Sequence, residues 1–156
     1  MDIGRDALAL SLQMADRRVA ETPLRNALWR SLELDPADPQ APQRIKALVV
    51  APQFGPAGFA RLAAVVNRLA EAGERQAGEI LRRNADALAQ MSAAVARALE
   101  LEAPPVCAMG GAIENLAMFR SCFTEALAAS LPVGRIVLAQ GDGCDGALAM
   151  AVELVC

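Results

Sequence analysis

Two short apolar runs near the C-terminal end are the only segments of this sequence that predict β-strands. They lie at residues 106–109 and 135–139, and a helical pattern at about 115–130 separates them. This order predicts a right-handed parallel βαβ unit with both strands buried. Two parallel strands cannot cover the faces and edges of a sheet by themselves. We therefore expect a partner chain, or an N-terminal segment outside these 156 residues, to supply further strands.

The rest of the sequence has helical periodicity. Hydrophobic residues make up 54% of the chain and aromatic residues only 3%, which suits helices that pack closely through small side chains. The spacing predicts helices at about 2–16, 23–34, 43–50, 57–72, 74–100, 115–130 and 147–155. Thr22 is expected to cap the second helix, and Pro23 fits its first turn. The predicted fold class is therefore α/β and helix-rich.

The longest predicted helix carries an apolar stripe that is expected to face the core. The stripe consists of Ala77, Ile80, Leu81, Leu88, Met91, Val95 and Leu99. Stripes of this kind usually form core, so this one predicts no chemistry.

Charge and composition exclude several kinds of function. The net charge is −3 and Lys46 is the single lysine, so no basic run could follow a nucleic-acid backbone. No apolar stretch is long enough to span a membrane, and residues 1–6 lack the apolar core of a signal peptide. With no histidine and no C-x-x-C pair, the sequence argues against a zinc site and excludes Ser-His-Asp catalysis. The cysteines are expected to be reduced structural thiols of a cytoplasmic protein. They are Cys107, Cys122, Cys144 and Cys156.

A glycine pair follows the first predicted strand. Gly110 and Gly111 have no Cβ, so another molecule could approach the backbone closely there. The start of the next helix offers free N–H groups, and ligands of parallel α/β sheets bind at the carboxyl ends of the strands. The candidate nucleotide contacts are therefore Gly110, Gly111, Ala112 and Asn115. The alternative interpretation is a tight connection without a ligand.

The loop after the second predicted strand is another candidate. Residues 140–146 contain Asp142 and Asp145, whose carboxylates could hold a metal ion or a hydroxyl group. We favour a structural interpretation, in which Asp145 caps the closing helix and the glycines form the turn.

In their order and spacing, these motifs resemble a known family. Residues 106–115, an apolar strand followed by the Gly-Gly turn, resemble the adenosine motif of actin-like ATPases. Residues 2–8 resemble the start of the helix after the conserved Gly-Ser-Gly turn of the BadF/BadG/BcrA/BcrD-type ATPases. The joint near residues 71–74 and the closing turn at 140–148 resemble the same family. The resemblance covers nearly the full length and is greatest to the C-terminal half of bacterial N-acetylglucosamine kinases.

The resemblance implies a fold and an activity. The fold would be the C-terminal lobe of an actin-like ATPase, with an RNase H-like core, a helical part at 1–104 and a βαβα nucleotide-side part at 105–156. ATP and Mg²⁺ would bind between this lobe and an N-terminal lobe that the sequence lacks, with Gly110, Gly111 and Ala112 on the adenosine side. The parent enzyme would phosphorylate an amino sugar such as N-acetylglucosamine. Family members often form dimers, so a homodimer is also implied.

The family's groups for phosphoryl transfer have no counterpart in this sequence. The phosphate-binding turns and the aspartate that activates the sugar hydroxyl lie upstream in the family, and the reaction needs both. The chain alone is therefore expected to be inactive as a kinase, and no catalytic residue is assigned.

Two other functions remain open. One is an ATPase that activates a 2-hydroxyacyl-CoA dehydratase, although the cysteine-led signature of that branch is not visible here. The other is a non-catalytic helical interaction module, which the Ala- and Leu-rich surface of a lone lobe would favour.

Overall fold

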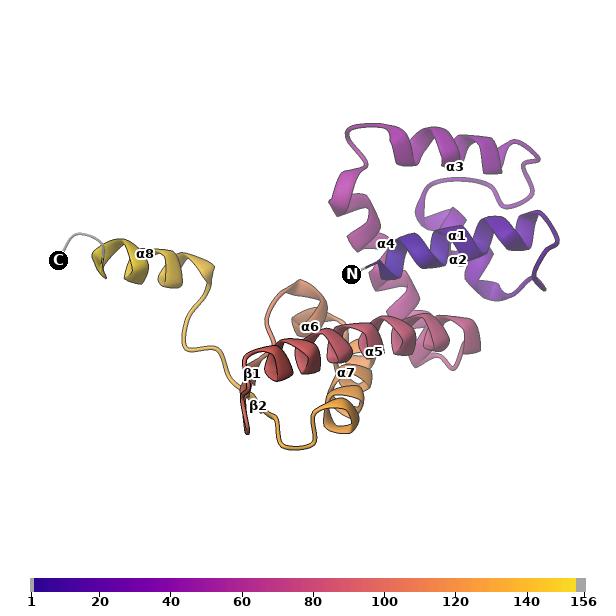
Figure 1. Ribbon diagram of the computed structural model, residues 1–156. Coiled ribbons are helices and arrows are strands. Elements are labelled where there is room, and N and C mark those ends of the chain that lie inside the picture. Colours follow the sequence, from indigo (N-terminus) through magenta and orange to yellow (C-terminus); the bar gives the residue numbers. More distant parts are fainter. Residues whose placement is uncertain (1, 154–156) are drawn as a thin grey trace.

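A computed structural model describes residues 2–153 of the chain (Figure 1). Its helices are α1 (Ile3–Ala15), α2 (Pro23–Ser31), α3 (Ala41–Val50), α4 (Gly55–Glu71), α5 (Arg75–Ala98), α6 (Gly111–Asn115), α7 (Ala117–Ser130) and α8 (Gly143–Glu153). Strands β1 (Pro105–Cys107) and β2 (Arg135–Val137) pair in parallel, with Val106 opposite Ile136. The described part is therefore helix-rich with one small parallel sheet, which confirms the predicted class at this level.

Local sequence signals set the ends of several helices. Pro23 begins α2, and the Oγ1 atom of Thr22 accepts a hydrogen bond from the backbone N–H of Leu24 at 3.3 Å, as predicted. Between α4 and α5, Gly73 adopts a left-handed backbone with φ +86°, a conformation that glycine adopts without strain. The Glu74 carboxylate then accepts from the N–H of Ala77 at 2.6 Å and caps α5.

The core begins where α1, α2 and α4 pack together. Trp29 of α2 is fully buried, and its indole Nε1 donates to the Oγ of Ser11 in α1 at 3.0 Å. Because both side chains are buried, water cannot reach the indole N–H or the hydroxyl oxygen, and this hydrogen bond satisfies both groups. One continuous cluster joins this region to α5 and α7, so all the large helices share a core.

The contact between α5 and α7 is the most extensive in the molecule, and alanines dominate the α5 side of it. The buried residues of α5 are Ala77, Ile80, Leu81, Ala85, Ala89, Ala93 and Ala96. The predicted stripe was right in its first turns and wrong at Met91, Val95 and Leu99, which are 57–64% exposed. Small side chains let α7 approach closely on the alanine side, so the larger apolar residues face away from it.

The sheet also differs from the prediction, because its strands are not buried. Pro105, Cys107 and Ile136 are exposed, and both strands end two residues earlier than the apolar runs indicated. Within the described residues the sheet has two strands, so most of its surface has no covering element.

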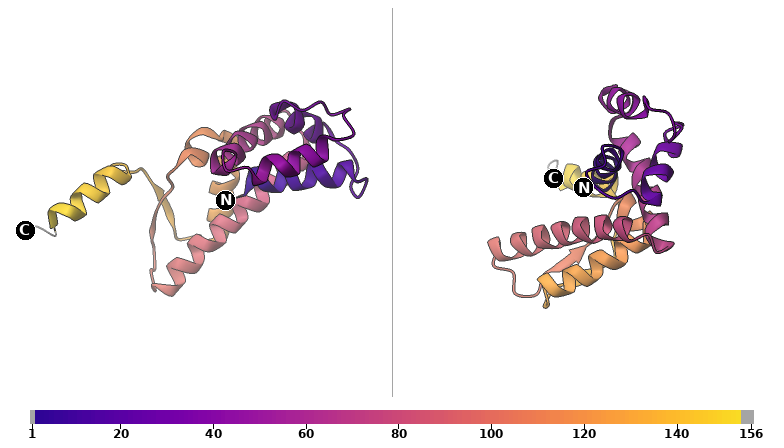
Figure 2. Two further views of the ribbon diagram at one scale, coloured as in Figure 1. Left: turned by 90° about the horizontal axis from the view of Figure 1, so that it is seen from above. Right: turned by 90° about the vertical axis from the view of Figure 1, so that its right-hand side faces the viewer.

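Helix boundaries in the C-terminal region were predicted less well. The helix expected at 115–130 is divided in two, because the buried Leu116 leaves helical geometry between α6 and α7. The closing helix begins at Gly143 rather than at residue 147. Figures 1 and 2 show α8 projecting away from the body of the molecule, and every residue from 138 to 153 is exposed. The part of the predicted closing helix beyond residue 153, and Cys156, lie outside the described residues.

Among residues 2–153, no helix combines the length and the apolar character needed to cross a membrane.

Candidate functional site

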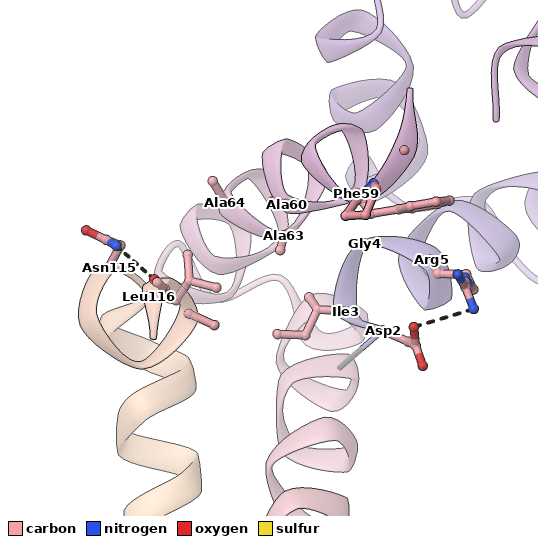
Figure 3. A pocket seen from close by; sticks show the side chains of 14 residues that line it. Asp2, Ile3, Gly4, Arg5, Phe59, Ala60, Ala63, Ala64, Asn115 and Leu116 are labelled. Atoms are coloured by element: carbon pink, nitrogen blue, oxygen red, sulfur yellow. Dashed lines mark hydrogen bonds and ion pairs between the residues drawn. The ribbon is translucent and has the colours of Figure 1, made fainter. Parts of the chain in front are cut away.

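A cavity of about 610 Å³ opens where the first turns of α1, α4 and α6 come together (Figure 3). Asp2 and the first residues of α1, Ile3 to Arg5, form one side, and Figure 3 shows Asn115 and Leu116 on the opposite side. The α4 wall between them carries Phe59 and three alanines. These alanines are Ala60, Ala63 and Ala64. Segments more than a hundred residues apart in the sequence therefore build one site.

Small residues create this space in two ways. They let α1 and α4 approach closely at Gly4, and they leave volume unfilled along the neighbouring face of α4. Gly4 of α1 lies against the backbone of Phe59, and a Cβ at Gly4 would lie 2.9 Å from the Phe59 carbonyl carbon. Only glycine permits this approach. Beyond that contact, the alanines of α4 fill less volume than leucine or valine would. The cavity is thus a consequence of side-chain size along α1 and α4.

The predicted Gly-Gly turn forms part of the cavity wall. Gly111, Ala112 and Asn115 line the cavity, whereas Gly110 does not. Gly110 instead shapes the turn, because its φ of +104° belongs to the region that favours glycine. Three of the four candidate residues therefore line the cavity.

Two hydrogen bonds hold the turn in place. The N–H of Gly110 donates to Oε1 of Glu114 at 3.1 Å, and Nδ2 of Asn115 donates to the Gly111 carbonyl at 2.9 Å. A Cβ at Gly111 would meet only the Asn115 amide nitrogen, at 3.6 Å. The backbone at Gly111 is therefore open to a ligand atom.

The polar groups of the cavity stand at its two ends. At one end, Nη1 of Arg5 lies 3.6 Å from Oδ1 of Asp2, and the Arg5 guanidinium lies 5.3 Å from the centroid of the Phe59 ring. Both charged side chains are largely exposed, so their ion pair contributes about 0–1 kcal/mol and can rearrange. Asn115 provides the polar group at the other end.

This arrangement suits a flat, largely apolar ligand with polar edges. An apolar cavity with a few converging polar groups is the usual form of a small-molecule site. A guanidinium group also stacks on planar rings, which gives Arg5 a means of holding a heterocycle. Neither Arg5 nor the α4 wall was among the predicted contacts. The run of alanines at helical spacing on α4 was the signal that could have indicated open space there.

The second candidate, the loop at 140–146, forms a helix cap. The Oδ1 atom of Asp142 accepts from the N–H groups of Cys144 and Asp145, at 2.7 and 3.0 Å. The Asp145 carboxylate reaches back to the N–H of Asp142 at 2.8 Å, which completes a reciprocal capping arrangement. The cap is thus Asp142, and our assignment of that role to Asp145 was wrong. In the described part of the chain, no three His, Cys, Asp or Glu side chains are grouped so that they could hold a metal ion.

Comparison of the sequence with known protein families found no family that matches, and comparison with curated proteins found no match.

Proposed function

We propose that this chain is the nucleoside-binding lobe of an ATP-dependent amino-sugar kinase, of the N-acetylglucosamine kinase type that its sequence resembles. One observation carries the proposal. Two segments that resemble that family, the start of α1 and the helix that follows the Gly-Gly turn, lie on opposite sides of one cavity. They are separated by about a hundred residues in the sequence, and the packing of α1 and α7 against α4 places them at the same cavity.

In this proposal the cavity takes the adenosine part of ATP. The base lies between the Arg5 end and the turn, where the guanidinium can stack on it and the Asn115 amide can meet a polar edge. The open backbone at Gly111 admits the ribose or the α-phosphate. The apolar α4 wall excludes water from the remaining face of the ring.

The rest of the reaction belongs to the complementary lobe. Phosphoryl transfer requires clamped phosphates, a bound metal ion and a positioned acceptor. We assign Mg²⁺, the phosphate turns and the sugar to that lobe, and we propose an RNase H-like core completed by its strands. The chain alone then binds nucleotide weakly in the cytoplasm and transfers no phosphate.

Isothermal titration calorimetry with ADP tests this proposal. Wild-type chain should bind ADP with micromolar to millimolar affinity. Gly111→Glu should abolish the heat, because the new carboxylate occupies the cavity and repels phosphate. The matched control is Gly143→Glu, since Gly143 is also the first residue of a helix and also has open space around it. The proposal fails if folded wild-type protein gives no heat, or if the two variants behave alike.

The non-catalytic interaction module is the second candidate, and one observation favours it. Large apolar side chains of α5 and α8 are exposed, including Met91, Val95, Leu148 and Met150. Contiguous apolar surface that solvent can reach marks interaction sites in soluble proteins. Self-association in a folded chain with no affinity for ADP or adenosine would support this function over the first.

A further inference from the structure

Helix α8 has the composition of a buried helix but lies entirely in solvent. Residues 147–152 read Ala-Leu-Ala-Met-Ala-Val, so apolar side chains surround the helix on all sides. Leu148, Met150 and Val152 are 55–67% exposed, and α8 has no buried residue. A helix that is apolar all round belongs in the interior of an assembly.

A groove on the same chain has matching properties. It has a volume of about 360 Å³ and lies between the last turns of α5 and strand β1. Met91, Val95, Leu101, Pro105 and Val106 are among its lining residues, and none of the lining side chains is charged. The exposed part of the α5 stripe extends about 12 Å from residue 91 to 99, and α8 with its eleven residues extends about 16 Å, so the lengths are compatible.

The total surface of the chain indicates how much is left to cover. The chain exposes 9933 Å², whereas a compact monomer of 16.3 kDa exposes roughly 7,500 Å². The excess is about 2,400 Å². A permanent homodimer buries about 1,000–2,500 Å² on each partner, so the excess is the amount that one such interface removes.

The charge of the C-terminal region argues against a lipid surface as the occupant. Residues 138–153 contain Asp142, Asp145 and Glu153 and no basic residue. Helices that lie on membranes combine an apolar face with a basic polar face, because membrane surfaces are anionic. With eleven residues, α8 is also too short to span a bilayer.

We propose that two copies of this chain form a dimer by exchanging α8, each copy placing its α8 in the α5–β1 groove of the other. The exchange covers the exposed α5 stripe, one side of the sheet and α8 in a single closed interface. Exchange of one terminal element between two copies is a low-cost route to a symmetric dimer. The proposal concerns this surface alone and does not depend on nucleotide binding.

Light scattering after size-exclusion chromatography tests the dimer with three matched variants. Val95→Asp places a carboxylate in the groove, and Val152→Asp places one on α8. Val50→Asp is the control, because Val50 is a 79% exposed valine of α3 outside both surfaces. Wild type and Val50→Asp should have twice the mass of one chain. Val95→Asp and Val152→Asp should raise the dimer Kd about tenfold or more, because the interface would bury an unpaired charge. All three valines are exposed in the single chain, so circular dichroism should show the same fold in every variant.

Mixing the two defective variants distinguishes exchange from other arrangements. In a mixed dimer the groove of the Val152→Asp copy meets the α8 of the Val95→Asp copy, so one of the two exchanged contacts is intact and both carboxylates fall in the other. Because a contact already broken by one carboxylate loses little more from a second, the mixture should dimerise more tightly than either variant alone and less tightly than wild type. The proposal is wrong if wild type is monomeric, if it forms larger assemblies, or if Val95→Asp leaves the dimer unchanged. It is equally wrong if the mixture shows no complementation, because α8 would then pack on its own chain or against another α8.

Discussion

Replacing Gly4 by alanine tests how closely α1 and α4 must approach to form the cavity. The new Cβ would overlap the carbonyl oxygen of Phe59 and lie 2.9 and 3.1 Å from its carbonyl carbon and Cα. All three are backbone atoms, so no side-chain rotation can relieve the overlap and the helices must separate. Overpacking of this kind costs about 1–3 kcal/mol. Alanine favours the helix by up to about 1 kcal/mol relative to glycine, which offsets part of that cost.

The expected result for Gly4→Ala is a fall in the free energy of unfolding of about 1–2 kcal/mol. This corresponds to a fall in Tm of roughly 2–8 °C for a chain of this length. Urea denaturation followed by circular dichroism measures it. The control is Gly78→Ala in α5, where the Cβ would meet only the flexible end of Arg82 at 3.6 Å or more. That variant should be as stable as wild type or more stable by up to about 1 kcal/mol. Equal effects of the two substitutions would refute the close approach of α1 and α4.

Two further predictions concern buried groups. Ser11→Ala should lower the free energy of unfolding by about 1–3 kcal/mol, because it leaves the Trp29 indole N–H buried without a partner. The same substitution should cost less in a Trp29→Phe background, which has no indole N–H. An equal loss of stability in both backgrounds would contradict the hydrogen bond between Trp29 and Ser11. Burial, with a smaller contribution from Glu125, raises the pKa of the Cys122 thiol. A smaller fraction of Cys122 is therefore thiolate at mildly alkaline pH than of a thiol with an ordinary pKa. Iodoacetamide should modify Cys122 more slowly than the exposed Cys107 of β1 and Cys144 of α8. Peptide mass spectrometry measures the three rates. Modification of Cys122 first would contradict its partial burial.

Helical periodicity and capping signals predicted most of the fold. The positions of α1, α4 and α5 follow from apolar spacing, and Thr22 and Pro23 set the start of α2. The errors occur where tertiary packing decides between two similar faces. One face of α5 carries alanines, and another carries Met91 and Val95 and is continued by Leu99. Hydrophobicity alone predicts that the face with the larger residues is buried. The structure buries the alanines, because α7 needs a close approach.

The candidate site was predictable on one side only. Gly110 and Gly111 indicate a turn by themselves, because a glycine pair directly after a strand is typical of a tight connection. The opposite wall depends on how α1 and α4 cross, which the close contact at Gly4 determines. Nothing in the local sequence around Phe59 or Ala60 indicates that they face the same space as Asn115. The strands were expected to be buried because apolar runs usually are, but burial requires neighbours that a two-stranded sheet lacks.

The central claim is that the cavity between α1, α4 and the Gly-Gly turn binds the nucleoside part of ATP. The most direct test is an amide NMR titration of ¹⁵N-labelled chain with ADP, followed by adenosine alone. We expect the amide signals of Arg5, Gly111, Ala112 and Asn115 to shift together with both ligands, while the amide signal of Gly143 does not move. Shifts confined to other parts of the chain, or no shifts at millimolar ligand, would contradict the claim and leave the Gly-Gly turn as a structural connection.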